Sequence, residues 1–174
     1  DPLMAPLREL LTSVTVYEIS GRDALQAGDW PAAADAFRRG LELEPDDPAL
    51  RHELGTALYA SGDVDSAKRE FMTVIRQTPS FANAHISLAT ILSLQGNYSE
   101  ARDEFSVALQ YHPNSVEGRF GLAEVLRVSG QVEAAVGEYE RVLKLDPTVV
   151  EAWVGFGAAL ITLERYRQAR DLHQ

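Results

Sequence analysis

Few side chains in this sequence have a type and spacing that could do chemistry. The histidines are His52, His85, His112 and His173. His52 and Glu53 resemble the start of a zinc-protease motif, which needs a second histidine four residues after the first. Thr56 stands at that position, so we expect no metal site. The chain has no cysteine, which excludes disulfides, thiolate metal sites and cysteine nucleophiles.

Two other short motifs are formally present but lack the context that their chemistry requires. Gly155 and Gly157 begin like a dinucleotide-binding fingerprint, but Leu160 occupies the place of the third glycine and no strand precedes them. Asn97 begins an N-glycosylation sequon, but we expect an asparagine at that point to be a helix cap and not a glycosylation site. The sequence contains no phosphate-binding loop or serine elbow. We therefore expect no enzyme activity and no cofactor.

A repeat of 34 residues organises the chain and must position whatever site it carries. The recurring residues are Pro45, Pro79, Pro113 and Pro147; Ala33, Ala67, Ala101, Ala135 and Ala169; and Gly28, Gly62, Gly96 and Gly130. The period predicts a tandem array over residues 14–174. Its copies are 14–47, 48–81, 82–115 and 116–149, with a partial copy at 150–174.

Each copy has the pattern of two antiparallel helices. In the second copy, Leu54 and Leu58 are spaced for one helical face before Gly62, and a second apolar stripe follows it. Gly62 suits a left-handed turn, and Asp63 can cap the next helix. Residues 1–13 lie outside the repeat, but their leucines predict a short N-terminal helix. The sequence therefore predicts an all-α protein with nine repeat helices and this additional one.

Small and aromatic side chains recur at facing positions of the two helices. Gly21, Gly55, Ala89, Ala123 and Gly157 share one position in the first helix, where we expect tight contacts. Phe37, Phe71, Phe105 and Tyr139 share one position in the second helix and are expected to fill the gap toward the next copy. One copy alone cannot bury these faces, so stacking must form a continuous core.

With these residues in place, the chain resembles the tetratricopeptide repeat family over residues 14–174. The second copy matches the family pattern at Leu54, Gly55, Leu58, Ala67, Phe71 and Pro79. The early aromatic of the pattern survives as Tyr17 and Trp153, but Arg51, His85 and Arg119 replace it elsewhere. The resemblance implies a right-handed α-solenoid of antiparallel helix pairs. Its concave groove, lined by the first helices, would hold a peptide or a partner segment.

One subclass of that family binds the acidic C-termini of chaperones through a clamp of lysine, asparagine and arginine. The corresponding positions are Glu18, Arg22, Glu53, Asn83 and Ser87 if the clamp begins in the first copy, and His52, Thr56, Ser87, Glu117 and Gly121 if it begins in the second. Neither set supplies the cations that a carboxylate needs. We therefore expect that a chaperone tail is not the partner.

The net charge of −10 also restricts the partners. Residues 14–47 carry eight acids and three bases, so the acidity lies mainly at the N-terminal end. No segment has the basic face that nucleic acid requires. No apolar run is long enough to span a membrane and no leader opens the chain, so we expect a soluble protein without membrane insertion. We also expect the chain to be a piece of a longer protein, and its localisation is unknown.

Two function classes fit these observations. The first is a non-catalytic scaffold or adaptor that binds a partner segment in the groove, and the alternative is a structural spacer or self-assembly array without a groove ligand. The candidate groove residues are His52, Tyr59, Ile86, Phe120, Gly121, Glu124, Arg127, Val154, Gly155 and Ile161. Exposed apolar groups gathered on one face indicate a partner. Some of these side chains could instead pack between neighbouring first helices.

The expected groove is acidic, and its apolar side chains are concentrated toward the C-terminal half. Its charged candidates are Glu18, Glu53, Glu117, Glu124 and Glu151 against Arg22 and Arg127. This balance favours an apolar partner segment with basic flanks. Gly121 and Gly155 could leave room for a bulky anchor of that segment, or could only allow close packing. The partial fifth copy leaves an open C-terminal edge, which predicts self-association or fraying from Tyr166.

Overall fold

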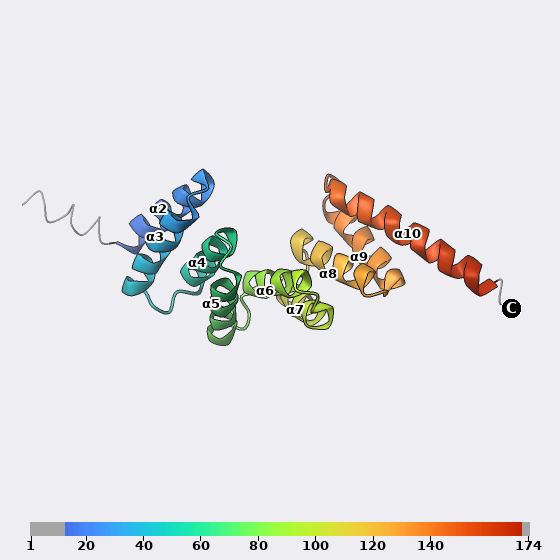
Figure 1. The fold of residues 1–174 in the computed structure, drawn as a ribbon, viewed down its shortest axis with the longest axis horizontal. Coiled ribbons are helices and arrows are strands. Elements are labelled where there is room, and N and C mark those ends of the chain that lie inside the picture. The colour runs from blue at the N-terminus through green and yellow to red at the C-terminus, as the bar shows by residue number, and fades with distance from the viewer. Residues whose placement is uncertain (1–12, 172–174) are drawn as a thin grey trace, which may run out of the picture. The chain divides into compact units, whose positions relative to one another are not determined.

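The computed structural model describes residues 13–171, with side chains placed through residue 164. This range contains nine α-helices and no strand (Figure 1). The helices are α2 (Val14–Ala27), α3 (Trp30–Leu43), α4 (Pro48–Ala60), α5 (Val64–Gln77), α6 (Ala82–Leu94), α7 (Tyr98–Tyr111), α8 (Val116–Val128), α9 (Val132–Leu145) and α10 (Val150–Asp171). The expected all-α class is confirmed. The short helix expected within residues 1–13 falls outside the described residues.

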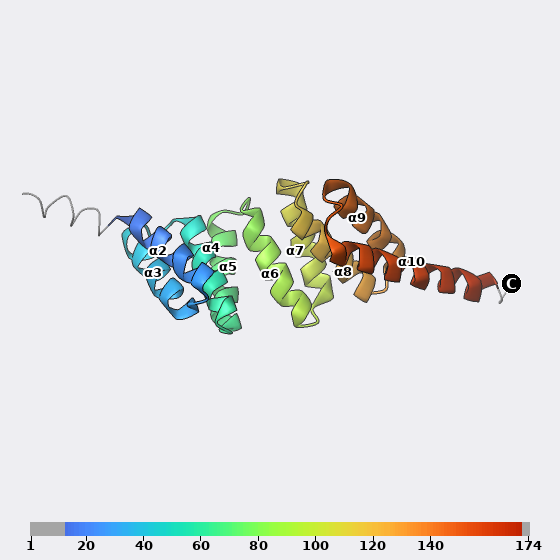
Figure 2. The ribbon, with the colours of Figure 1, turned by 90° about the horizontal axis from the view of Figure 1, so that it is seen from above.

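The helices form consecutive antiparallel pairs in two compact units. The first unit covers residues 1–84, and its helices α2 to α5 pack in chain order. The second unit covers residues 85–174 and contains most of α6 with α7 to α10. Within it, α8 contacts α7, α9 and α10, and Figure 2 shows α8, α9 and α10 as neighbours. Side chains from α8 therefore reach several surfaces of this unit.

A glycine in the left-handed conformation closes the turn inside each of the four pairs. Gly28, Gly62, Gly96 and Gly130 have φ angles of 75°, 89°, 80° and 82°. Residues with a Cβ are strained at these angles, so glycine ends the first helix at little cost. Asp29 and Asp63 then cap the second helix by accepting the backbone N–H of Ala32 and Ser66. Asn97 occupies the same position before α7, although its side chain makes no capping hydrogen bond.

The last, partial copy differs from this plan. The partial copy over residues 150–174 contains one helix, α10, which runs unbroken from Val150 to Asp171 and completes the nine expected repeat helices. The 34-residue interval places Glu164, instead of a glycine, where the turn would form. A left-handed residue with a Cβ costs roughly 1–2 kcal/mol, and no cap residue compensates for it here, so the helix continues.

Aromatic rings from the second helices lie against glycines of the first helices. A Cβ at Gly55 would lie 2.6 Å from the ring of Phe71, and a Cβ at Gly21 would overlap Phe37. These contacts confirm that the shared small position allows tight packing within a pair. Gly157 has the same position in the repeat, but none of the described atoms lies within 4 Å of a Cβ placed there. The expectation of a tight contact is wrong for this glycine.

A polar side-chain pair replaces the early aromatic where the family pattern lacks one. Arg51 binds Glu70 at 3.0 Å, His85 contacts Glu104 at 2.6 Å, and Arg119 binds Glu138 at 2.9 Å. Each pair joins the first and second helices of one copy across the same 19-residue interval. The side chain at position 153 is again aromatic, and the Trp153 indole N–H donates to the Pro147 carbonyl, as the Arg51 guanidinium does to Pro45. The departures from the pattern thus keep the two helices connected.

Candidate functional site

Two cavities of about 370 Å³ each open on the second unit and share a wall. The first is lined by Phe120, Glu124 and Arg127 of α8 and by Val150, Glu151, Val154, Gly155 and Ala158 of α10. The second is lined by Thr90, Ser93 and Leu94 of α6, Phe105 of α7, and Glu117, Phe120, Gly121 and Glu124 of α8. Phe120 and Glu124 belong to both. We call the two cavities together the α8 groove.

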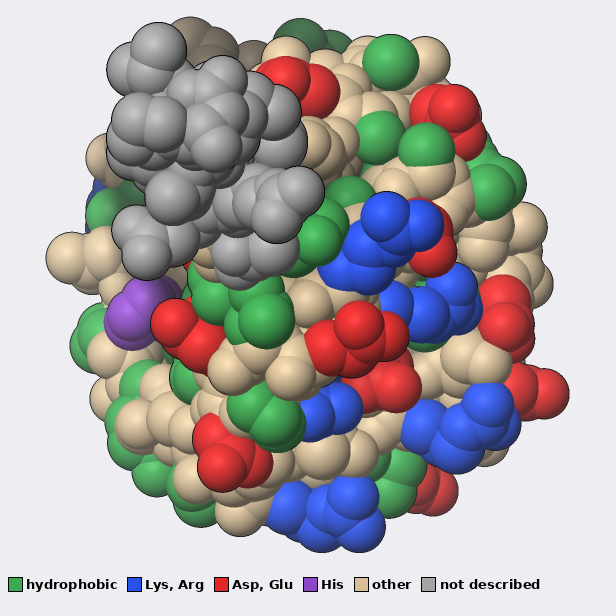
Figure 3. Space-filling model, turned by 90° about the vertical axis from the view of Figure 1, so that its left-hand side faces the viewer, with side chains coloured by type: hydrophobic (Ala, Val, Ile, Leu, Met, Phe, Trp, Pro, Cys, Tyr) green, Lys and Arg blue, Asp and Glu red, His purple; other side chains and the backbone are tan. Residues whose placement is uncertain are grey.

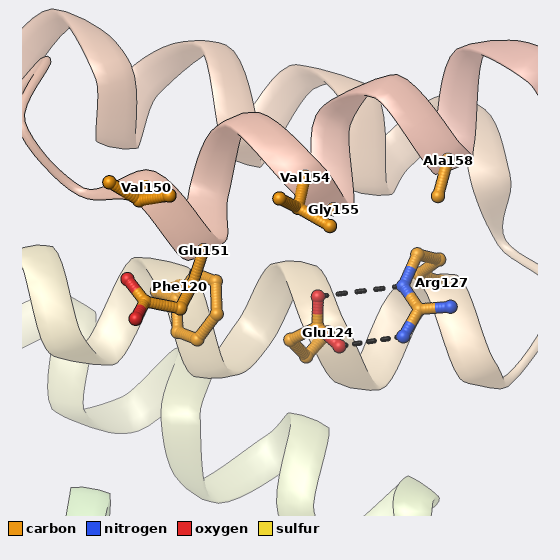
Figure 4. Close-up of a pocket in the computed structure, with 8 residues that line it drawn as sticks. All are labelled: Phe120, Glu124, Arg127, Val150, Glu151, Val154, Gly155 and Ala158. Atoms are coloured by element: carbon orange, nitrogen blue, oxygen red, sulfur yellow. Dashed lines mark hydrogen bonds and ion pairs between the residues drawn. The ribbon is translucent and has the colours of Figure 1, made fainter.

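Helical periodicity places the lining residues of each wall on one face of their helix. Val150, Val154 and Ala158 are four residues apart and lie on one face of α10. Phe120 and Glu124 have the same spacing on α8, and Figure 4 shows the side chains of the two helices on either side of the first cavity. Val150 and Val154 remain 66% and 68% exposed. The groove therefore presents apolar surface that no described residue covers.

The Phe105 ring forms the floor of the second cavity, and the Tyr139 ring packs against Gly155 of the first. A Cβ at Gly121 would overlap the Phe105 ring, and a Cβ at Gly155 would lie 2.6 Å from the ring of Tyr139. Both rings are buried, as expected for residues that fill the gap between copies. The aromatic rings thus already fill the space beside these two glycines, so close packing explains why glycine occurs at both positions. A ligand side chain would have to lie above the rings, beside Phe120.

Among the described residues that line the groove, Arg127 is the only cation, and hydrogen bonds within the protein hold it. The Arg127 guanidinium donates to Glu124 at 2.7 Å and to the Tyr139 hydroxyl at 3.3 Å, while that hydroxyl donates to Glu124. Burial would raise the pKa of Glu124, but the hydrogen bonds from Arg127 and Tyr139 outweigh it and hold the pKa below its usual value. The bond with Glu124 raises the pKa of Arg127. Arg127 is therefore engaged before any ligand arrives.

Two carboxylates of the groove are unengaged. Glu117 lines one cavity and Glu151 the other, and both side chains are exposed. Neither has an ion-pair or hydrogen-bond partner among residues 13–164. With Glu124 and Arg127 included, three acids and one base line the groove, which leaves a surplus of two negative charges. The groove can therefore accept cationic groups at both of its cavities.

Six of the ten residues suggested by the sequence line this groove. They are Phe120, Gly121, Glu124, Arg127, Val154 and Gly155. Ile161 is exposed on α10 but lines neither cavity. Ile86 is only 3% exposed, because it packs toward α8, where Gly118 carries no side chain. Ile86 is thus a core residue.

The other two suggested residues, His52 and Tyr59, lie on α4 of the first unit. The His52 ring packs between Phe71 and Phe81, with centroid distances of 5.2 and 5.5 Å. Burial there lowers the pKa of His52, an effect partly offset by a hydrogen bond with the backbone of Asn83. This histidine is part of the packing of its unit.

Several groove residues were not among those suggested by the sequence. They are Thr90, Ser93, Leu94, Phe105, Val150 and Ala158, whereas Glu117 and Glu151 were already among the charged candidates of the expected groove. The spacing of four between Val150, Val154 and Ala158 is a signal that could have identified the α10 wall. No such spacing in the sequence identifies Leu94, which is 72% exposed at the end of α6. Its position becomes informative only once α6 and α8 are packed together.

Other kinds of site find no support in the described part of the chain. Residues 13–164 contain no group of three or more histidine, aspartate or glutamate side chains that could hold a metal ion. No helix over the described range is long and apolar enough to cross a membrane. Figure 3 shows one face of the molecule, on which acidic and basic side chains are interspersed with hydrophobic ones.

Comparisons with known proteins agree with this geometry. Models of the tetratricopeptide repeat match residues 24–91, 82–105, 95–150 and 120–173. A TPR repeat-containing thioredoxin of Arabidopsis thaliana, TTL4, is 33% identical over 66 residues, which are 38% of this chain and 10% of that protein. This chain therefore spans only a small part of that relative.

Solved structures extend the similarity to most of the chain. MamA from Desulfovibrio magneticus RS-1 has a TM-score of 0.77 at 18% identity, covering 91% of this chain and 89% of that one. YrrB, described as a TPR protein with an unusual peptide-binding site, has a TM-score of 0.72 at 18% identity, covering 94% and 84%. At this level of identity the likeness shows the fold.

Proposed function

Because this chain belongs to the tetratricopeptide repeat family, whose repeats are scaffolds for protein–protein interaction, we propose that it binds a partner segment in the α8 groove. The segment would place one or two apolar side chains beside Phe120 and Val154. Its basic flanks would reach Glu117 and Glu151. In this proposal the stretch is a non-catalytic adaptor that needs no cofactor.

The observation that carries the proposal is the combination of exposed apolar walls with unengaged carboxylates. Valines left two-thirds exposed on one helical face are typical of a surface that is covered by a partner. The surplus of negative charge favours lysine or arginine on that partner and disfavours acidic tails. The solved structure of YrrB supports a peptide as occupant, since its description names a peptide-binding site in a protein of the same fold.

The alternative role is a spacer or a self-assembly array. A pure spacer is expected to have polar, solvated side chains along its groove, whereas Phe120, Val150 and Val154 line this one. Self-association remains a prediction for α10, which also exposes Trp153, Leu160 and Ile161. Light scattering at several concentrations would test it, and a strict monomer would contradict it.

A peptide array probed with the 174-residue chain tests the proposed function. We expect the strongest binders to combine apolar residues with lysine or arginine flanks. Phe120→Ala and Val154→Asp should then weaken the best peptide at least tenfold, because they remove the apolar contacts of both walls. Gly121→Glu is unsuitable because its side chain would collide with Phe105.

A matched control is Val128→Ala, which alters an exposed valine of α8 that lines neither cavity. It should leave the affinity unchanged. The proposal would be wrong if the best binders were acidic, or if Phe120→Ala and Val154→Asp both bound like the parent.

A further inference from the structure

A third cavity on the second unit has the opposite charge. It measures about 180 Å³ and is lined by Asn114, Arg119, Arg141, Lys144 and Leu145. We call it the basic pocket. Only five lysines and arginines occur in residues 85–164, and three of them line this pocket. Such a concentration is unusual in a chain with a net charge of −10.

Two helices and one turn bring these groups together. Arg141 and Lys144 are three residues apart on α9 and therefore lie on one face of that helix. Arg119 comes from the first turns of α8, and Asn114 lies in the turn before it. None of these residues lines the α8 groove. The basic pocket is thus a separate site.

One carboxylate partly neutralises the pocket. Glu138 accepts from Arg119 at 2.9 Å and also from Arg141. Lys144 has no ion pair among the described residues. The carboxylate of Asp146, which follows Leu145, is engaged by the backbone and hydroxyl of Thr148. The three cations that line the pocket, less the one carboxylate of Glu138 that binds them, leave a surplus of two positive charges.

Each arginine retains free donors after these contacts. A guanidinium carries five N–H groups, and the bonds to Glu138 use one nitrogen of each arginine. Lys144 adds an ammonium group, and the Asn114 side chain adds an amide. The pocket therefore offers several donors around a volume suited to a small group. Its single apolar lining residue, Leu145, leaves little surface for an apolar ligand.

We propose that the basic pocket binds a phosphate group. A phosphate monoester such as phosphoserine carries a charge of about −1.5 to −2 at neutral pH, which matches the surplus of the pocket better than the single charge of a carboxylate. Its oxygens can accept from the arginine forks and from Lys144 at the same time. Binding here would be independent of the α8 groove, so one molecule could hold an apolar basic segment and a phosphate group together.

A titration of the 174-residue chain with inorganic phosphate tests the proposal, with backbone amide resonances as the readout and ionic strength held constant with sodium chloride. We expect saturable shifts at Asn114, Arg119 and Lys144. Lys144→Gln and Arg141→Gln should each weaken binding at least fivefold. Lys144 is exposed and has no ion pair or hydrogen bond among the described residues, so its substitution should leave the fold intact. Arg102→Gln, which alters a cation outside the pocket, should bind like the parent.

Two further titrations separate specific binding from general attraction and identify the source of the phosphate. Acetate should bind at least tenfold more weakly than phosphate. A phosphoserine peptide that binds more tightly than both inorganic phosphate and its unphosphorylated form would indicate a modified partner, and equal binding by peptide and inorganic phosphate would indicate a free anion. The proposal would be overturned if phosphate caused no saturable shifts, if acetate bound equally well, or if neither pocket variant altered binding.

Discussion

The α8 groove and the basic pocket share a helix but have opposite excess charge. In the groove, Arg127 is the minority charge, and Glu124 and Tyr139 hold it in place. In the basic pocket, Glu138 is the minority charge, and Arg119 and Arg141 hold it. In both places, groups of the majority charge remain unengaged.

This comparison shows why net charge predicts little about local surfaces. In each cavity, the side chain of opposite charge is already held by neighbouring side chains, so the excess charge of the cavity remains exposed to solvent. The two sites differ in their apolar content as well. The apolar lining of the groove includes two phenylalanines and two valines, whereas that of the basic pocket is one leucine. We therefore expect the groove to depend on core packing and the pocket to depend on charge.

The largest effect that would separate the two sites is expected for Phe105→Ala. This change removes a ring that is 2% exposed and forms part of the groove floor. The lost burial and the resulting cavity should lower the free energy of unfolding by about 3–5 kcal/mol. Chemical denaturation measures it. A loss below about 1 kcal/mol would contradict the packing described here.

Two glycines of α10 give a smaller and more selective test. Gly155→Ala should lower the free energy of unfolding by roughly 1–3 kcal/mol, because the new methyl group overpacks against Tyr139. Gly157→Ala, two residues away in the same helix, meets open space and should raise it by about 0.5–1 kcal/mol. Thermal or chemical denaturation of both variants gives the comparison. Equal effects would show that the groove floor does not depend on this contact.

Neutralising the free carboxylates of the groove should affect binding and not folding. An exposed ion pair contributes about 0.2–1 kcal/mol, so Glu117→Gln and Glu151→Gln should each weaken the binding of a basic apolar peptide by roughly 1.4- to fivefold. Phosphate binding by the basic pocket should not change. Fluorescence anisotropy with one peptide measures the affinity, with Glu133→Gln as an exposed control outside the groove. Tighter peptide binding by either variant would contradict the charge assignment.

The smallest expected effect is a pH dependence that comes from Glu124. Its folded pKa lies below the unfolded value, so its contribution to stability is complete above about pH 4.3 and is lost as the pH falls through the lowered pKa. Melting temperatures from pH 6 to pH 2.5 should therefore show the parent and Glu124→Gln converging as the pH falls. Tyr139→Phe removes one hydrogen-bond donor to Glu124, so its melting temperatures should lie between those of the parent and of Glu124→Gln. A gap that widens in acid would reverse the sign and contradict this account.

Much of the fold could be predicted from the sequence because the residues that mark the 34-residue period act through local backbone conformation and helix capping. Gly62 and Asp63 mark a turn by conformational freedom and capping, which depend only on neighbouring residues. In α10 the same interval places Glu164 where the turn would form, and the helix continues. The absence of a glycine at that position was the relevant signal.

The candidate site was less predictable because it depends on which helices are neighbours. Phe120 and Val154 could be suggested from their positions in the repeat. Ile86 could not be distinguished from them, although packing toward Gly118 buries it. The basic pocket had no signal within any one segment, because Arg119 and Lys144 are 25 residues apart and meet through the packing of α8 against α9.

The most direct test of the central claim is to locate the binding surface by nuclear magnetic resonance. The chain, labelled with nitrogen-15, would be titrated with the best apolar basic peptide from the array. We predict saturable shifts at Glu117, Phe120, Glu124, Glu151 and Val154, with no change at Asn114 or Lys144. Shifts confined to the basic pocket or to the first unit, or no saturable shift in the α8 groove, would contradict the claim that this groove binds the partner.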